Sequence, residues 1–261
     1  MQEEPPRWGD AAGWWDELRL VLGFLTRVPV FRAEEVPAGA LARASWSFPI
    51  VGLGIGLVGG IAYGVVTALG VPLLPAALIA VGATVLVTGA LHEDGLADTA
   101  DGFFGGADRE ARLAIMRDSR SGAYGVLALV FSITLRAAAL AAIGDAGHVA
   151  AALVAAHTAA RGGLPLIMRA LEPARLDGLG AAAGRPEAPI AWGAAGLGAL
   201  IALVTLGFVP GIAALVIGAA AMMLMAGLAR RQIGGYTGDA LGAVEQAGEI
   251  VILLAAAAWA R

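Results

Sequence analysis

The stretch PIVGLGIGLVGGIAYGVVTALG, residues 49–70, carries no charged side chain from end to end. About 20 consecutive apolar residues in a helix are enough to span the hydrocarbon core of a bilayer. Six further stretches of this kind follow, at 72–91, 122–143, 148–168, 190–208, 210–229 and 240–260. We therefore predict an all-α, polytopic integral membrane bundle with about seven transmembrane helices, forming a single domain over residues 1–261.

The composition supports the same class. The chain is 59% hydrophobic and only 15% charged, with a mean hydropathy of +0.78, whereas soluble domains average about 45–50% apolar and about 25% charged residues. Cysteine is absent, which excludes disulfides and thiolate metal sites. Glycines stand at positions 52, 56, 60 and 64 of the first span. At this spacing they line one face and are expected to let another helix approach, with no chemical role.

We expect that the N-terminal residues are not a secretory signal, because residues 1–11 are acidic, contain proline and lack a basic segment before a short apolar core. We expect residues 1–11 to be flexible. Residues 12–26 are predicted to form an amphipathic interfacial helix. Its apolar stripe contains Trp14, Trp15, Leu18, Leu22 and Leu25. A helix docked on the protein itself is the alternative.

All seventeen basic residues are arginines, and most of them fall in the N-terminal segment and in the loops after the second, fourth and sixth spans. The positive-inside rule therefore places the N-terminus and these loops in the cytoplasm and the C-terminus outside. Ionisable residues also occur within the spans, at Arg136, His157, Arg161, Glu245 and Glu249. We expect Arg–Glu pairs there, and the lining of a polar substrate cavity is the alternative.

The segment HEDGLADTADG, residues 92–102, is the most informative for chemistry. Asp94, Asp98 and Asp101 stand at i, i+4 and i+7, so a helix projects all three from one face. Carboxylates so placed repel one another unless a cation binds, and an all-oxygen donor set favours Mg²⁺ or Mn²⁺ over Zn²⁺. A solvated acidic helix end is the alternative. His92 is a candidate ligand or phosphate partner, or only a hydrogen-bonding group at the helix end.

Two other segments return to the same face. In RDSRSGAYG, residues 117–125, Arg117 and Arg120 offer forked donors for phosphate, and Asp118 is a further candidate metal ligand. Ser119 and Ser121 are candidate caps for the next helix. The alternative is a basic membrane anchor with a cap. A third segment, GGYTGD, has glycines whose backbone N–H groups can approach phosphate. Its candidate residues are Gly234, Gly235, Thr237, Gly238 and Asp239.

These motifs resemble the cobalamin synthase family, the adenosylcobinamide-GDP ribazoletransferases. The resemblance rests on HEDGLADTADGFFGG (92–106), DSRSGAYG (118–125), GGYTGDALGA (234–243) and FLTRVPV (24–30), in that order, and covers about residues 20–255. It implies a Mg²⁺-dependent, multi-pass enzyme of the cell inner membrane. Such an enzyme joins adenosylcobinamide-GDP to α-ribazole or its 5′-phosphate, releases GMP and gives adenosylcobalamin or its phosphate.

The resemblance also implies roles for the residues singled out above. The metal ligands would be Asp94, Asp98, Asp101 and Asp118. Asp101 or Asp239 would accept the hydroxyl proton, Arg117 and Arg120 would stabilise developing charge, and the glycine segment would hold the GMP part. His92, Ser119 and Thr237 complete the candidate substrate-binding set. No nucleic-acid partner is expected, and whether the chain forms a homo-oligomer is left open.

Two other functions are alternatives to this one. CDP-alcohol phosphotransferases also have an Asp-Gly-rich metal motif, but their pattern requires Ala-Arg after Asp-Gly, and here Ala97 is followed by Asp98. A cation or corrinoid transporter would use the intramembrane charges and have functional loops on both faces. The connections on the outer face are short and almost uncharged, which favours the enzyme.

Overall fold

The computed structural model describes residues 11–30, 39–118 and 120–260 of the chain. Regular structure within these ranges is helical, apart from one isolated parallel bridge between Pro173 and Tyr236. The all-α prediction is confirmed. Residues 1–11 are expected to be flexible, and residues 1–10 of this segment lie outside the described residues.

Six helical segments are long and apolar enough to cross a membrane. They are Ala40–Ala68, which comprises α2 (Ala40–Ala44), a 3-10 turn (Ser45–Ser47) and α3 (Phe48–Ala68), then α7 (Ala123–Ile143), α8 (Ala146–Ala170), α10 (Ala188–Leu206), α11 (Phe208–Ile233) and α12 (Gly238–Trp259). A seventh crossing results if α4 (Leu73–Thr88) and α5 (Leu91–Gly105) count together. The predicted polytopic bundle is therefore confirmed.

The second predicted span is interrupted. α4 ends at Thr88, before the expected limit at residue 91, and the chain turns by 92° into α5. Gly89 and Ala90 both have positive φ angles, 64° and 59°, which end the helix. Glycine adopts this conformation freely, whereas alanine is strained there. The bend gives the acidic segment a helix of its own that points away from the α4 axis.

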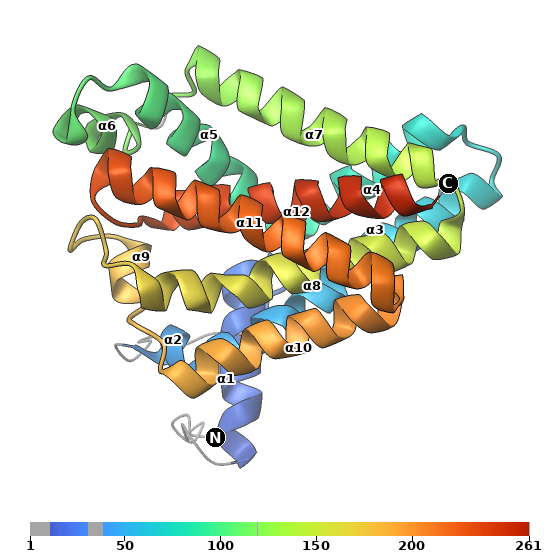
Figure 1. Ribbon diagram of the computed structural model, residues 1–261, viewed down its shortest axis with the longest axis horizontal. Coiled ribbons are helices and arrows are strands. Elements are labelled where there is room, and N and C mark those ends of the chain that lie inside the picture. Colours follow the sequence, from blue (N-terminus) through green and yellow to red (C-terminus); the bar gives the residue numbers. More distant parts are fainter. Residues whose placement is uncertain (1–10, 31–38, 119, 261) are drawn as a thin grey trace.

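Different helices and connections lie at the two ends of the bundle (Figure 1). One end gathers α5, α6 (Arg109–Ile115), α9 (Leu179–Ala182) and the turn between α11 and α12. The opposite end holds the α3–α4, α7–α8 and α10–α11 connections together with the last turn of α12. The three motif segments predicted to share one face therefore do lie at the same end of the molecule.

The glycine stripe of α3 packs against α8, as predicted. A Cβ atom built on Gly56 would lie 2.6 Å from Val154 Cα, and one built on Gly60 would lie 2.7 Å from Ala150 Cβ. Real Cβ atoms do not approach so closely, so only glycine permits this backbone separation. The backbones of α3 and α8 are thus closely packed along this stripe.

The N-terminal helix α1 (Ala11–Leu25) crosses the direction of the bundle helices instead of following it (Figure 1). Its buried side chains Leu20, Val21 and Leu25 join a core cluster that includes residues of α3. Trp14 and Trp15, expected on the same stripe as Leu25, are instead exposed. The helix is therefore docked on the protein by one face, and contact of its tryptophans with the membrane interface stays a prediction.

Candidate active site

Two glycines allow α5 and α12 to cross closely at the end of the bundle that also holds α6 and α9. A Cβ atom built on Gly95 would lie 2.7 Å from the Asp239 carbonyl oxygen, and one built on Gly242 would lie 3.1 Å from that of His92. This contact between backbones presses the acidic face of α5 against the first turn of α12. Two segments separated by more than a hundred residues therefore form one site.

The crossing gathers carboxylates that the sequence placed in different motifs. Asp98 lies close enough to Asp94, Asp101 and Asp239 for repulsion between the ionised groups to be significant. Arg175, from the loop between α8 and α9, offsets part of this charge, with its Nη2 atom 3.4 Å from Asp239 Oδ2. The arrangement has more negative than positive charge and favours a cation.

A cavity of about 330 Å³ opens beside these carboxylates. Its polar wall contains His92, Asp94, Arg175 and Asp239, together with glycine backbone at positions 178, 180, 238 and 242. The apolar part of the lining comes mainly from the N-terminal helices, α3 and α8, with single leucines from α5 and α12. Cavities of this kind, apolar with a few convergent polar groups, are the usual form of a small-molecule site.

Asp101 has a different environment from the other two acidic residues of α5. It is buried, and its two oxygens accept hydrogen bonds from Gly122 N at 2.7 Å and Gly125 N at 2.9 Å. These N–H groups belong to the N-terminus of α7, where such donors have no partner within the helix. Asp101 therefore caps α7 from a neighbouring helix. The cap expected from Ser121 is wrong, because the N-cap residue is Gly122 and has no side-chain cap of its own.

The arginines of the 117–125 segment are paired near the surface. Arg117 Nη2 donates to both carboxylate oxygens of Asp177 at 2.6 and 2.7 Å, and Arg120 Nη2 donates to Asp118 Oδ2 at 2.6 Å. Hydrogen bonds from Arg120 lower the pKa of the Asp118 carboxyl to about 2, so this group is ionised and already bound to a cation at neutral pH. Neither arginine lines the cavity. Ser119 lies outside the described residues.

Backbone packing accounts for much of the 234–239 segment. Gly234 ends α11 with a φ of 81°, and a Cβ atom on Gly235 would lie 2.1 Å from the Glu172 carbonyl oxygen. Thr237 caps α12 by accepting a hydrogen bond from Ala240 N at 3.1 Å. Of the predicted phosphate-binding residues in this segment, only Gly238 lines the cavity, next to Asp239. A phosphate-binding role for the other three stays a prediction.

Behind the cavity, the ionisable residues of the spans form one buried network across four helices. Arg136 Nη1 on α7 donates to Glu93 Oε1 at 3.0 Å and to Glu249 Oε1 at 2.9 Å. Arg161 on α8 pairs with Glu245 and approaches His92 Nδ1 at 3.2 Å. The expected Arg–Glu pairing inside the bundle is confirmed, and because His92 also lines the cavity, the network reaches the site.

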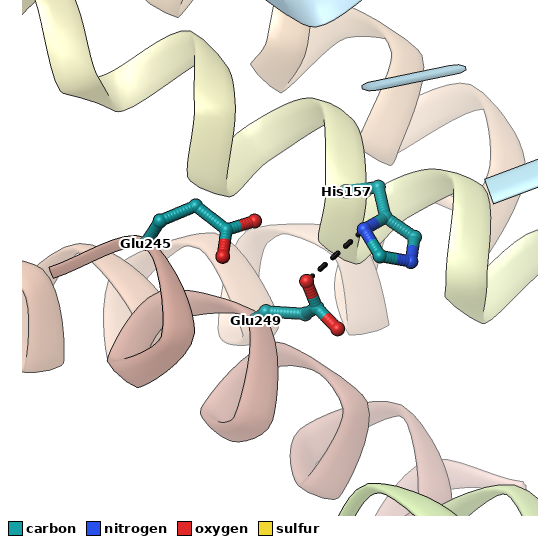
Figure 2. Close-up of side chains that lie close together, drawn as sticks. All are labelled: His157, Glu245 and Glu249. Carbon is teal, nitrogen blue, oxygen red and sulfur yellow. Dashed lines mark ion pairs between the residues drawn. The ribbon is translucent and has the colours of Figure 1, made fainter. Parts of the chain in front are cut away.

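The tightest group of conventional metal ligands among the described residues lies within this network. His157, Glu245 and Glu249 place one ligand atom each within 4.8 Å of one another, and Figure 2 shows His157 directed at Glu249 across the helix interface. Two guanidinium groups already occupy it, because Arg161 pairs with Glu245 and Arg136 pairs with Glu249. The positive charge there is supplied by arginine, so this group does not fit a metal ion.

Arg175 is a candidate site residue that the sequence did not single out. Its position in a loop rich in arginine matched the pattern of a membrane anchor. In the structure it lines the cavity beside Asp239, and its Nη1 atom is buried without a hydrogen-bond partner among the described residues. A buried, unpaired guanidinium donor beside carboxylates is suited to an anionic group of a substrate.

Comparison with known proteins shows the family of the chain. The family model described as cobalamin-5-phosphate synthase matches residues 17–257. A protein of Bradyrhizobium diazoefficiens named adenosylcobinamide-GDP ribazoletransferase is 50% identical over 243 residues, covering 93% of this chain and 94% of that protein. The protein of the same name from Mesorhizobium japonicum is 46% identical over 241 residues, covering 92% of both chains. No solved structure matches the chain. The chain therefore belongs to the cobalamin-5-phosphate synthase family.

Proposed function

We propose that this chain is a membrane-embedded adenosylcobinamide-GDP ribazoletransferase. It joins adenosylcobinamide-GDP to α-ribazole or its 5′-phosphate, releases GMP and forms adenosylcobalamin or its 5′-phosphate. The observation that carries the proposal is the α5–α12 crossing. It sets Asp94 beside Asp239 and Arg175 at one cavity, with the Asp98 carboxylate close enough to repel those of Asp94 and Asp239. The names of the similar proteins supply the substrates.

The donor set fits Mg²⁺ as the cofactor. Asp94 and Asp98 offer carboxylate oxygens one helical turn apart. Asp101 and Asp118 are held by hydrogen bonds from the protein, whereas no described residue donates a hydrogen bond to, or forms an ion pair with, the carboxylate of Asp94 or Asp98. Oxygen-only ligation with room for water is what Mg²⁺ prefers. When bound, the ion would neutralise charge on the pyrophosphate. We therefore propose Asp94 and Asp98 as its protein ligands, and we assign Asp101 and Asp118 positioning roles instead.

The remaining residues provide positioning and charge. A ribose hydroxyl of the ribazole attacks the phosphorus atom that carries cobinamide, the bond to the bridging oxygen breaks, and GMP leaves with that oxygen. Asp239 lines the cavity and accepts the hydroxyl proton. Arg175, with its free Nη1 donor, binds a phosphate oxygen and stabilises charge in the transition state.

The first test measures GMP release by the purified protein with adenosylcobinamide-GDP, α-ribazole and Mg²⁺. Asp94→Asn and Asp98→Asn each remove one anionic ligand. We expect kcat to fall by at least about a hundredfold, as losses of transition-state charge stabilisation commonly do, and the Mg²⁺ concentration for half-maximal rate to rise.

Glu110→Gln is the matched control, because Glu110 is an exposed acid on α6, at the same end of the molecule. It is expected to retain normal turnover and Mg²⁺ dependence. Correctly inserted Asp94→Asn and Asp98→Asn proteins with normal turnover and normal Mg²⁺ dependence would show that the metal assignment is wrong.

We also propose that the protein lies in the cell inner membrane with the N-terminus and the active site in the cytoplasm. The support is the distribution of arginine, which is concentrated at the end of the bundle that holds the cavity. Cytoplasmic loops are enriched in Lys and Arg. The substrates then reach the site from the cytoplasm.

A further inference from the structure

The two walls of the cavity beside Asp239 differ in chemistry. One wall carries His92, Asp94, Arg175 and Asp239. The apolar wall comes mainly from α1, α2, α3 and α8, with Phe24, Leu25, Leu41, Phe48, Leu164 and Met168. Leu91 of α5 and Leu241 of α12 add further apolar side chains to the lining. Most of the six side chains named first are buried in the same core cluster, so the wall is a fixed part of the fold.

We infer that this apolar wall binds the benzimidazole base of the ribazole substrate and selects it over other bases. The inference rests on the proposed function and adds a specificity site to it. The reacting hydroxyl must lie beside Asp239 and Arg175 on the polar wall. Since the base is attached to the same ribose, it falls within the cavity, whose apolar lining includes Leu164 and Met168.

The size of the cavity indicates that it holds this base and not the corrin ring. At about 330 Å³, it lies at the low end of the range of about 300–1,000 Å³ found for ligand pockets. This volume suits a nucleoside, whereas the corrin macrocycle with its side chains is several times bulkier and stays outside the cavity. The phosphate attached to cobinamide therefore approaches from the mouth.

The apolar side chains of the wall favour binding of the benzimidazole base over binding of guanine. Guanine carries a carbonyl and an amino group that lose free energy when buried without hydrogen-bond partners. Phe48, Leu164 and Met168 offer none. The two methyl groups of dimethylbenzimidazole need no partner, and they gain from burial against aliphatic and aromatic side chains.

His92 supplies the one polar contact that this base requires. A guanidinium only donates hydrogen bonds, so His92 Nδ1, 3.2 Å from Arg161 Nη2, is the acceptor of that contact. The ring hydrogen then resides on Nε2, and because His92 lines the cavity, we assign this N–H as the donor to the unsubstituted ring nitrogen of the base. The buried Arg161–Glu245 pair thereby fixes the orientation and tautomer of a substrate-binding residue.

The test compares ribosides in the purified enzyme. Leu164→Ala and Met168→Ala remove contacts to the base, and we expect the KM for α-ribazole to rise at least about tenfold, the usual effect of a missing methylene or more in an apolar pocket. The KM for adenosylcobinamide-GDP and the Mg²⁺ dependence should not change. The riboside of unsubstituted benzimidazole should lose less, because it lacks the methyl groups that make these contacts.

Leu153→Ala is the matched control, since Leu153 is equally buried on α8 but belongs to the other core cluster. It should leave both KM values unchanged. Met168→Leu nearly conserves the side-chain volume, so it is expected to fold even if an alanine variant does not. We expect it to alter the ratio of KM values for the two ribosides, with the KM for adenosylcobinamide-GDP unchanged.

Two results would overturn the inference. One is an unchanged KM for both ribosides in all three wall variants. The other is a rise in the KM for adenosylcobinamide-GDP, with stronger or weaker inhibition by GMP, which would show that the wall holds guanine. A wild-type protein that releases no GMP would instead contradict the proposed function.

Discussion

At the scale of single residues, Asp101 shows how one member of an acidic motif can serve the fold. Its two oxygens accept hydrogen bonds from Gly122 N and Gly125 N, and a Cβ atom on either glycine would lie 2.4 Å from one of these oxygens. Asp101→Asn turns an amide NH₂ toward one of these donors. We expect a loss of about 1–3 kcal/mol in the free energy of unfolding, the cost of an unsatisfied buried donor.

Thermal unfolding in detergent measures this loss. Titration of the activity with Mg²⁺ shows whether Asp101 is a helix cap or a metal ligand. For a cap, the Mg²⁺ concentration for half-maximal rate stays at the wild-type value while the midpoint of unfolding falls. If Asp101 were a metal ligand, the Mg²⁺ requirement would rise while stability changed little.

The spacing of Asp94, Asp98 and Asp101 was enough to predict that they share a face of one helix. It could not separate their environments, because these depend on residues far away in the sequence. Asp101 meets the start of α7, whereas Asp94 meets the cavity beside Asp239. Arg175 could not be predicted as a site residue, since a loop arginine has the same sequence pattern whether it anchors the loop or faces a substrate.

At the scale of elements, some glycines of α3 lie against α8 and others face open space. A Cβ atom on Gly56 would lie 2.6 Å from Val154 Cα, whereas one on Gly54 meets no atom within 4 Å. Gly56→Ala forces the backbones apart, and we expect it to destabilise the protein by about 1–3 kcal/mol, as overpacking does. Gly54→Ala is the control in the same helix and should be neutral or slightly stabilising.

Thermal unfolding of both variants in the same detergent measures the difference. Equal midpoints for the two alanine variants would show that α3 and α8 are not in contact at Gly56. The periodicity of the glycines predicted such a face, but it did not identify the partner. The break between α4 and α5 was not predicted either, because glycine and alanine at residues 89 and 90 also occur within transmembrane helices. Their positive φ angles, which end α4, are a property of the folded chain.

At the scale of the whole molecule, the buried charges connect the helices that carry the site. Arg136 and Arg161 come from α7 and α8, and their carboxylate partners come from α5 and α12. Removing one member of such a pair leaves an uncompensated charge, at a cost of about 3–5 kcal/mol. The network thus fixes the relative positions of α5 and α12, on which the crossing beside Asp94 and Asp239 depends. The sequence predicted that these charges pair, but the identity of each pair follows from the packing of four helices.

The orientation of the whole bundle can be tested because the chain contains no cysteine. Leu176 lies in the α8–α9 loop at the arginine-rich end, and Leu69 lies in the α3–α4 connection at the opposite end; both side chains are highly exposed. Leu69→Cys should react with a membrane-impermeant maleimide in intact cells whose outer membrane has been permeabilised. Leu176→Cys should react only after lysis, since arginine-rich loops stay in the cytoplasm. The reverse labelling pattern would place the cavity on the outer face, where substrates made in the cytoplasm could not reach it, and both the orientation and the proposed route of substrate entry would then be wrong.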